Sequence, residues 1–214
     1  MRIFISGGCK NGKSTYAQWM AKQQMKHLGS LYYVATMTAT DNEDIERIER
    51  HQKERDGWGF TTIEQPLGIE GILHQCDCSG SFLLDSLTAL LANEMFSVSG
   101  AFDDSDISSG FDFDAHKKIA AGITQILSKV GNIVIVSDYL YSDAAQYDQL
   151  TEAYRKSLAA LDRLTANHCD IVLEAAYTQI IVHKGRILFE KVFGKVPYAM
   201  QLKTPMRRMS EEAD

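Results

Sequence analysis

The feature that most constrains this chain is a glycine-rich segment directly after an apolar stretch near the amino terminus. Residues 3–5 are Ile-Phe-Ile, and Gly7–Ser14 has the sequence G-G-C-K-N-G-K-S, which fits G-x-x-x-x-G-K-[S/T]. Glycines in this pattern let successive backbone N–H groups face one concave anion site, at which the following helix points its positive end. Lys13 can bind β- and γ-phosphates, and Ser14 can offer its hydroxyl to Mg²⁺. The segment therefore predicts a phosphate-binding loop (P-loop) for a nucleoside triphosphate.

Short apolar runs alternate with helical patterns along the chain. This alternation predicts an α/β fold of the P-loop NTPase type, a mostly parallel sheet with helices on both faces. The strands are expected at residues 3–5, 31–35, 81–85, 132–137 and 170–174. The helices are expected at residues 14–27, 41–55, up to about 96 after the third strand, and 149–166, with Thr40 and Glu43 as a capping box for the second.

The carboxyl-terminal part carries a further strand signal. Residues 179–183 and 186–190 are apolar runs on either side of Lys184 and Gly185, which predicts a C-terminal β-hairpin with a tight turn. We expect one P-loop nucleotide-binding and transferase domain over residues 1–190 and a C-terminal extension over 191–214. Residues 97–114, rich in Ser, Gly and Asp, are either a solvated loop or a mobile lid over a substrate.

Composition excludes several classes of function. With 22 basic and 28 acidic residues the formal charge is −6, which argues against a nucleic-acid partner or a membrane-surface protein. No run approaches the ~18 apolar residues of a membrane span, and the amino terminus lacks a signal-peptide pattern, so we expect a cytoplasmic protein. Cys76 and Cys78 are too closely spaced for the usual zinc pair, and the 4 cysteines are expected to stay reduced.

Two carboxylates are candidates for holding Mg²⁺ near the P-loop. Asp85 and Asp138 each follow an apolar strand, where a P-loop protein needs an acidic side chain. Either could instead cap the helix that follows its strand. Sequence spacing leaves both open.

The expected second helix carries a stripe of basic side chains around a histidine. Arg47, His51 and Arg55 are spaced i, i+4, i+8 and share one face. Acid-before-base pairs such as Glu46 and Arg50 would also suit a solvated surface helix laced with ion pairs. Alternatively, a neutral imidazole can attack phosphorus to give a phosphoramidate, while nearby guanidiniums keep it neutral and bind phosphate oxygens.

Several motifs occur in one order. After the P-loop come Y-V-A-T at 33–36, R-I-x-R-H-x-x-x-R at 47–55, Thr62, Glu64 and Pro66, then L-L-D-S-L-T at 83–88 with Asn93. In this order the sequence resembles the bifunctional adenosylcobinamide kinase / adenosylcobinamide-phosphate guanylyltransferase family of cobalamin biosynthesis. The resemblance runs from residue 1 to about 185 and is dense over the first 95 residues.

The resemblance implies a two-step activity. Family members phosphorylate adenosylcobinamide with ATP or GTP, then transfer GMP from GTP to that phosphate, giving adenosylcobinamide-GDP; they are homotrimers with a P-loop fold. By position, His51 would be the guanylylated histidine, Lys13 a second catalytic residue, and Ser14 and Asp85 the Mg²⁺ ligands. The nucleotide-binding residues would be Gly7, Gly8, Cys9, Lys10, Asn11, Gly12, Lys13, Ser14, Val34, Ala35, Thr36, Gln52, Lys53, Glu54, Arg55, Glu64 and Asp85.

The second half of the chain departs from the family pattern. Where the family has Asn-Glu-Val-Gly, this chain has Asp138–Tyr141, and where it has Gly-x-x-Asn-Gln, this chain places Ala159, Asp162 and Arg163. The guanine-binding signature N-K-x-D is absent, so GTP is implied only by the resemblance. Two other functions remain open: a P-loop small-molecule kinase without a covalent histidine, and a GTP-binding homologue that does not catalyse.

Overall fold

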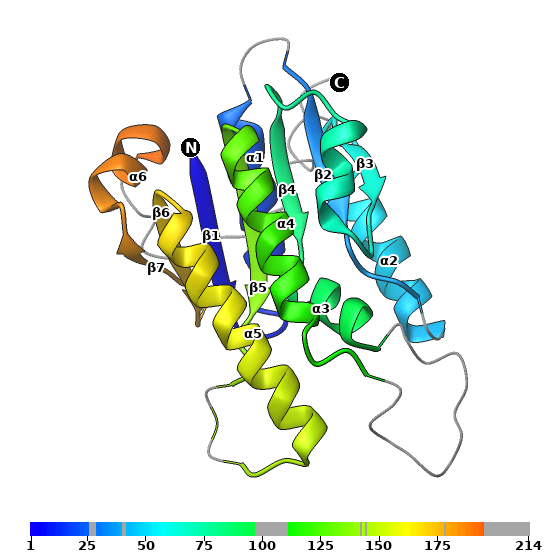
Figure 1. The fold of residues 1–214 in the computed structure, drawn as a ribbon. Coiled ribbons are helices and arrows are strands. Elements are labelled where there is room, and N and C mark those ends of the chain that lie inside the picture. The colour runs from blue at the N-terminus through cyan, green and yellow to red at the C-terminus, as the bar shows by residue number, and fades with distance from the viewer. Residues whose placement is uncertain are drawn as a thin grey trace, which may run out of the picture.

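The computed structural model describes residues 1–25, 29–39, 42–96, 111–141, 143, 145–177 and 179–194 (Figure 1). Within residues 42–55 it does not describe the side chains of Glu43, Asp44, Arg47, His51 and Glu54. The predicted N-cap Thr40, residues 97–110 of the predicted loop or lid, and residues 195–214 of the predicted extension lie outside the described residues.

A seven-stranded sheet forms the centre of the fold, with strand order β3-β2-β4-β5-β1-β6-β7. All neighbouring strands are parallel except β6 and β7, which are antiparallel. This confirms the predicted mostly parallel α/β architecture. The strands are β1 (Arg2–Gly7), β2 (Leu31–Ala35), β3 (Thr61–Glu64), β4 (Ser81–Asp85), β5 (Asn132–Asp138), β6 (Ile171–Ala176) and β7 (Gln179–Lys184).

Helices cover both faces of the sheet, as predicted. On one face α1 (Lys13–Gln24) and α6 (Arg186–Phe193) pack on the apolar cluster that contains Ile3 and Ile5 of β1. On the other face η1 (Ile69–His74), α3 (Leu87–Phe96), α4 (Ala115–Lys129) and α5 (Gln149–His168) pack on the cluster that contains Phe4. Successive β1 side chains enter opposite clusters because side chains alternate along a strand. The remaining helix, α2 (Asn42–Arg55), lies near β2 and β3 (Figure 1).

The carboxyl-terminal hairpin is present, but its second arm differs from the prediction. β7 pairs with β6, which precedes it, and residues 186–190 begin helix α6 instead of forming a strand. Gly185 has φ 78°, a left-handed conformation that turns the chain into the helix. Phe189 is fully buried against the sheet whereas Ile187 is 86% exposed. Residues two apart share one face in a strand but face opposite ways in a helix, so a short apolar run did not distinguish the two.

Three further elements, β3, η1 and α4, were not predicted from the sequence. β3 is a four-residue edge strand in which only Ile63 is buried, and so short a stretch carries no clear alternation. In the described part of the chain, no helix combines the length and apolar character needed to cross a bilayer.

Substitutions in α6 test its helical register. We expect Phe189→Ala to lower the free energy of unfolding by about 3–5 kcal/mol, because it removes a fully buried ring. Ile187→Ala should change it by less than about 0.5 kcal/mol, since that side chain is exposed. Urea denaturation of both variants measures this; equal losses would indicate that the two side chains share a buried face.

Candidate nucleotide-binding site

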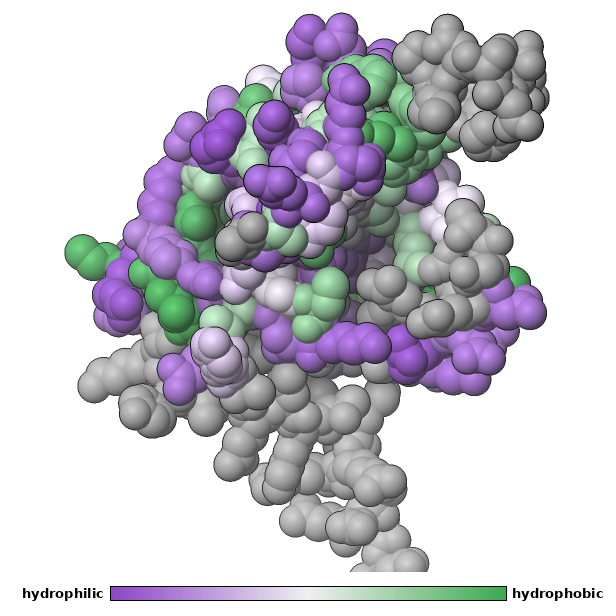
Figure 2. All heavy atoms as spheres, turned by 90° about the horizontal axis from the view of Figure 1, so that it is seen from below, coloured by the Kyte–Doolittle hydropathy of each residue, from purple (hydrophilic) through white to green (hydrophobic). Residues whose placement is uncertain are grey.

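The parallel strands bring the predicted nucleotide-binding residues to one edge of the sheet. Gly7 at the end of β1 lies opposite Asp138 of β5, and Ala35 of β2 lies opposite Asp85 of β4 and Glu64 of β3. Ligands of open parallel sheets bind at this carboxyl edge. Seen from that end, the molecule presents mainly hydrophilic side chains (Figure 2).

The P-loop has the backbone conformation that its glycines predict. Gly12 has φ 83° and Lys10 φ 58°, both left-handed, and α1 starts at Lys13 immediately after this turn. The Asn11 side-chain oxygen accepts the Lys13 N–H at 3.3 Å. The positive end of α1 therefore faces the loop, where an anion would be stabilised.

Gly7 is required by a close approach between the P-loop and β6. A Cβ atom at Gly7 would lie 2.4 Å from the Ala175 carbonyl oxygen and 2.6 Å from the Asn11 side-chain nitrogen. That nitrogen donates a hydrogen bond to the same Ala175 oxygen. Next to it, Gly8 has no atom within 4 Å of such a Cβ. Only the first glycine is therefore needed to let β6 hold the start of the loop.

Lys13 is nearly buried and forms an ion pair with Asp138. Its side chain is 8% exposed and that of Asp138 13%, and its ammonium also donates to the Gly8 carbonyl at 3.2 Å. The Asp138 N–H donates to the Thr88 hydroxyl at 2.8 Å, which ties the end of β5 to α3. Of the two carboxylates left open by the sequence, Asp138 is the one in direct contact with the P-loop lysine.

Asp85 lies on the far side of β5 from the P-loop strand. The Tyr33 hydroxyl donates to its carboxylate at 2.8 Å, and the Arg55 guanidinium stacks 3.6 Å from the centre of the Tyr33 ring. Burial raises the pKa of Tyr33 well above its ordinary value, as does the Asp85 charge, while Arg55 lowers it. Tyr33 therefore remains a protonated donor that links the last turn of α2 to Asp85.

A second set of hydrogen bonds joins the ends of β2, β3 and β4. The Thr36 hydroxyl accepts the Ser86 N–H at 2.7 Å and donates to the Ser86 carbonyl at 2.8 Å. The Asn93 amide donates to the Thr36 carbonyl at 2.6 Å and to the Pro66 carbonyl at 3.2 Å. Thr36 and Asn93 therefore hold together the backbone that follows β2, β3 and β4 at the carboxyl edge of the sheet.

The predicted nucleotide-binding residues on α2 differ in how far they are buried. Arg55 is buried on Tyr33, whereas Gln52 and Lys53 are exposed. His51 lies one turn before Arg55 on the helix, and its side chain, like that of Glu54, is outside the described residues. On β2 the Val34 side chain is fully buried in the core, so only its backbone could contact a nucleotide.

The comparisons with known proteins add to this geometry. A family model described as cobinamide kinase / cobinamide phosphate guanyltransferase matches residues 3–178. The chain belongs to this family. Its members are bifunctional kinases and nucleotidyltransferases of cobalamin biosynthesis, so the match confirms the resemblance and the class of enzyme that it implied.

Two solved structures match this one at low sequence identity. One is the flagellar accessory protein FlaH from Methanocaldococcus jannaschii, with a TM-score of 0.46, 15% identity, and coverage of 86% of this chain and 77% of that one. The other is the KaiC-like protein PH0186 from Pyrococcus horikoshii OT3, with a TM-score of 0.45, 12% identity, and coverage of 86% and 78%. No curated protein matches the sequence.

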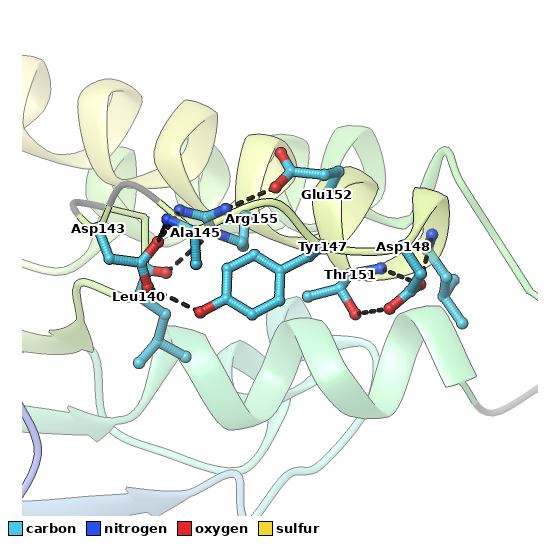
Figure 3. A network of polar contacts seen from close by, with 9 residues as sticks. Leu140, Asp143, Ala145, Tyr147, Asp148, Thr151, Glu152 and Arg155 are labelled. Carbon is cyan, nitrogen blue, oxygen red and sulfur yellow. Dashed lines mark hydrogen bonds and ion pairs between the residues drawn. The ribbon is translucent and has the colours of Figure 1, made fainter.

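In this cobinamide kinase / guanyltransferase homologue, the connection from β5 to α5 is organised by Arg155 (Figure 3). Arg155 donates to the Leu140 carbonyl at 3.1 Å, to Glu152 at 2.5 Å and to Asp143 at 2.9 Å. Its guanidinium lies 4.6 Å from the centre of the Tyr147 ring, and the Tyr147 hydroxyl donates to Asp143 at 2.9 Å. This network was not predicted from the sequence, because its only sequence signal is an arginine inside an amphipathic helix.

Two departures from the family pattern contact each other. The Tyr141 hydroxyl donates to the Asp162 carboxylate at 2.8 Å, where the family has Gly and Asn. Asp162 is 3% exposed, and burial raises its pKa to about 6, helped by the Asp138 charge and opposed by the Ser137 and Tyr141 hydroxyls. The altered segments thus form one buried polar contact close to Asp138.

The close approach at Gly7 generates a matched pair of variants. We expect Gly7→Ala to weaken nucleotide binding at least about tenfold, because displacing the loop from β6 costs more than ~1.4 kcal/mol. Gly131→Ala adds the same methyl group in open space before β5, at the opposite edge of the sheet, and should change binding by less than about threefold. Calorimetric titration with GTP measures both; similar affinities for the two variants would contradict the structural role of Gly7.

Because the pKa of Asp162 is raised, we expect the free energies of unfolding of the Asp162→Asn variant and the unsubstituted protein to differ by an amount that depends on pH. The folded chain holds the Asp162 proton more tightly than the unfolded chain does. Ionisation of Asp162 therefore lowers the free energy of unfolding as the pH rises from about 4 to about 6. The lost stability is not regained above about pH 6. Asp162→Asn removes the titration and keeps an acceptor for Tyr141. We expect the variant's stability relative to the unsubstituted protein to improve by about 2 kcal/mol from pH 4.5 to pH 8. Urea denaturation at both pH values measures this, and a difference independent of pH would contradict it.

Proposed function

We propose that this chain phosphorylates adenosylcobinamide and then transfers GMP from GTP to the resulting phosphate through a guanylyl-histidine at His51. The family match supports the two activities. The contact that supports the histidine is the stacking of Arg55 on Tyr33, which holds the helix of His51 against the sheet and connects it to Asp85. His51 precedes Arg55 by four residues on α2, which is about one helical turn.

The proposed guanylyl transfer has two balanced steps. A nitrogen of the neutral His51 imidazole forms a bond to the α-phosphorus of GTP as the bond to pyrophosphate breaks. An oxygen of adenosylcobinamide phosphate then attacks the same phosphorus, the P–N bond breaks, and the histidine is restored. The P-loop would hold the triphosphate by its backbone N–H groups and by Lys13.

The residues that would hold Mg²⁺ are Ser14 and Asp85. A hydroxyl and a carboxylate are the hard oxygen ligands that Mg²⁺ prefers, and the described hydrogen bond to Asp85 occupies one of its two carboxylate oxygens, leaving the other available. Mg²⁺ would neutralise charge on the phosphate oxygens. We further propose that the protein acts as a homotrimer in the cytoplasm, where its free cysteines stay reduced.

Covalent labelling tests the histidine intermediate. We expect incubation with α-labelled GTP and Mg²⁺ to leave on the denatured protein a label that is acid-labile and base-stable, as a phosphoramidate is. His51→Ala should abolish the label, and His74→Ala, which changes an exposed histidine at the end of η1, should retain it. Adding adenosylcobinamide phosphate should move the label to the corrinoid.

The same experiment distinguishes the alternative functions. Phosphorylation of adenosylcobinamide without protein labelling would indicate a kinase that lacks the covalent histidine. Nucleotide binding without labelling, and without corrinoid-dependent release of pyrophosphate, would indicate a homologue that binds but does not catalyse.

A further inference from the structure

We propose that Asp138 is the general base of the phosphoryl-transfer step, accepting the proton of the acceptor hydroxyl as that hydroxyl attacks the γ-phosphorus. This inference rests on the proposed function, and it assigns to Asp138 a role separate from the Mg²⁺ ligand Asp85. It also places the acceptor hydroxyl on the β5 side of the P-loop, away from α2 and His51.

The position of Asp138 is fixed by contacts on both sides. It ends β5 directly opposite Gly7 of β1, its own N–H is held by the Thr88 hydroxyl at 2.8 Å, and the next N–H, of Tyr139, donates to the Gly7 carbonyl at 3.3 Å. Adjacent strands lie ~4.8 Å apart, so the backbone of Asp138 is one spacing from the P-loop strand and that of Asp85 two, or ~10 Å. Of these two carboxylates, Asp138 is therefore the nearer to the start of the loop.

The ion pair with Lys13 shows where the carboxylate would act. In a P-loop the lysine binds the β- and γ-phosphates, so the group paired with Lys13 lies at the γ-phosphate end of the site. A bound triphosphate would compete with Asp138 for the ammonium. The carboxylate, itself only 13% exposed, would then have an oxygen free to accept a hydrogen bond from the acceptor hydroxyl.

Three ionisable side chains near Asp138 have partners other than Lys13. Tyr154 donates to the Thr88 carbonyl at 2.9 Å, and burial together with the charges of Asp138 and Asp162 raises its pKa, so it stays protonated. Asp162 accepts from Tyr141. Glu174, at the next strand along the edge, is paired with His183 at 2.7 Å. Among the described carboxylates on this side of the P-loop, Asp138 is the one placed against Lys13.

The step balances as follows. The acceptor hydroxyl oxygen forms a bond to the γ-phosphorus while its proton passes to a carboxylate oxygen of Asp138. The bond from that phosphorus to the bridging oxygen breaks, and its electron pair leaves with the nucleoside diphosphate. The proton then passes from Asp138 to solvent.

Asp138→Asn tests the inference because it keeps the shape and removes the basic oxygen. Positioned general bases contribute about 10²–10⁴-fold, so we expect kcat for phosphorylation of adenosylcobinamide to fall at least about 100-fold, with the KM for nucleotide within about threefold. Asp138→Glu should recover part of the rate. Asp114→Asn, the same chemical change at an exposed position paired with Lys117, should remain within about twofold of the unsubstituted protein.

Labelling of His51 in the same variants separates a base from a metal ligand. A base for phosphoryl transfer predicts that Asp138→Asn slows phosphorylation at least tenfold more than it slows protein labelling by α-labelled GTP. Equal losses in both reactions, restored by raising Mg²⁺, would identify a metal ligand and overturn the inference. Phosphorylation within threefold of the unsubstituted rate would also overturn it while leaving the proposed function intact, whereas an unsubstituted protein that phosphorylates no cobinamide would overturn both.

Discussion

Parallel pairing of β1 with β5 on one side and with β6 on the other determines where the P-loop can lie. Each parallel neighbour delivers its carboxyl end to the same edge, so the loop after Gly7 emerges between Asp138 and Ala175. The Ala175 carbonyl leaves no room for a side chain at Gly7 and accepts the Asn11 amide, and Asp138 meets the lysine of the loop. The charge and shape of the site both follow from this register.

The two sides of the site are stabilised in a similar manner. On the β2 and β4 side, Arg55 stacks on Tyr33, whose hydroxyl holds Asp85. On the β5 side, Arg155 stacks on Tyr147, whose hydroxyl holds Asp143. A guanidinium over an aromatic ring combines apolar contact with electrostatic attraction and gains more when it is shielded from water. Each side thus has a buried arginine stacked on a tyrosine whose hydroxyl holds a carboxylate.

The departures from the family pattern are better understood as one replacement than as scattered losses. Tyr141 and Asp162 are 21 residues apart in sequence yet share a hydrogen bond, so removing the Tyr141 hydroxyl alone would leave the buried Asp162 carboxylate without this donor. The carboxylate at 138 lies against Lys13. These positions alter the β5 side of the site, whereas the motifs on the β2 and β4 side remain close to the family pattern.

The sequence by itself determined the P-loop, the alternation of strands and helices and the family, because these depend on local patterns: glycine spacing, apolar periodicity and motif order. It also placed Asp85 and Asp138 at strand ends. Tertiary structure decided the rest. Residues 186–193 form a helix and not a strand because this conformation lets Phe189 pack against the sheet. Asp138, and not Asp85, forms the ion pair with Lys13 because β5 lies between β4 and β1. Strand order and packing arise from contacts between segments distant in the chain, which no local pattern records.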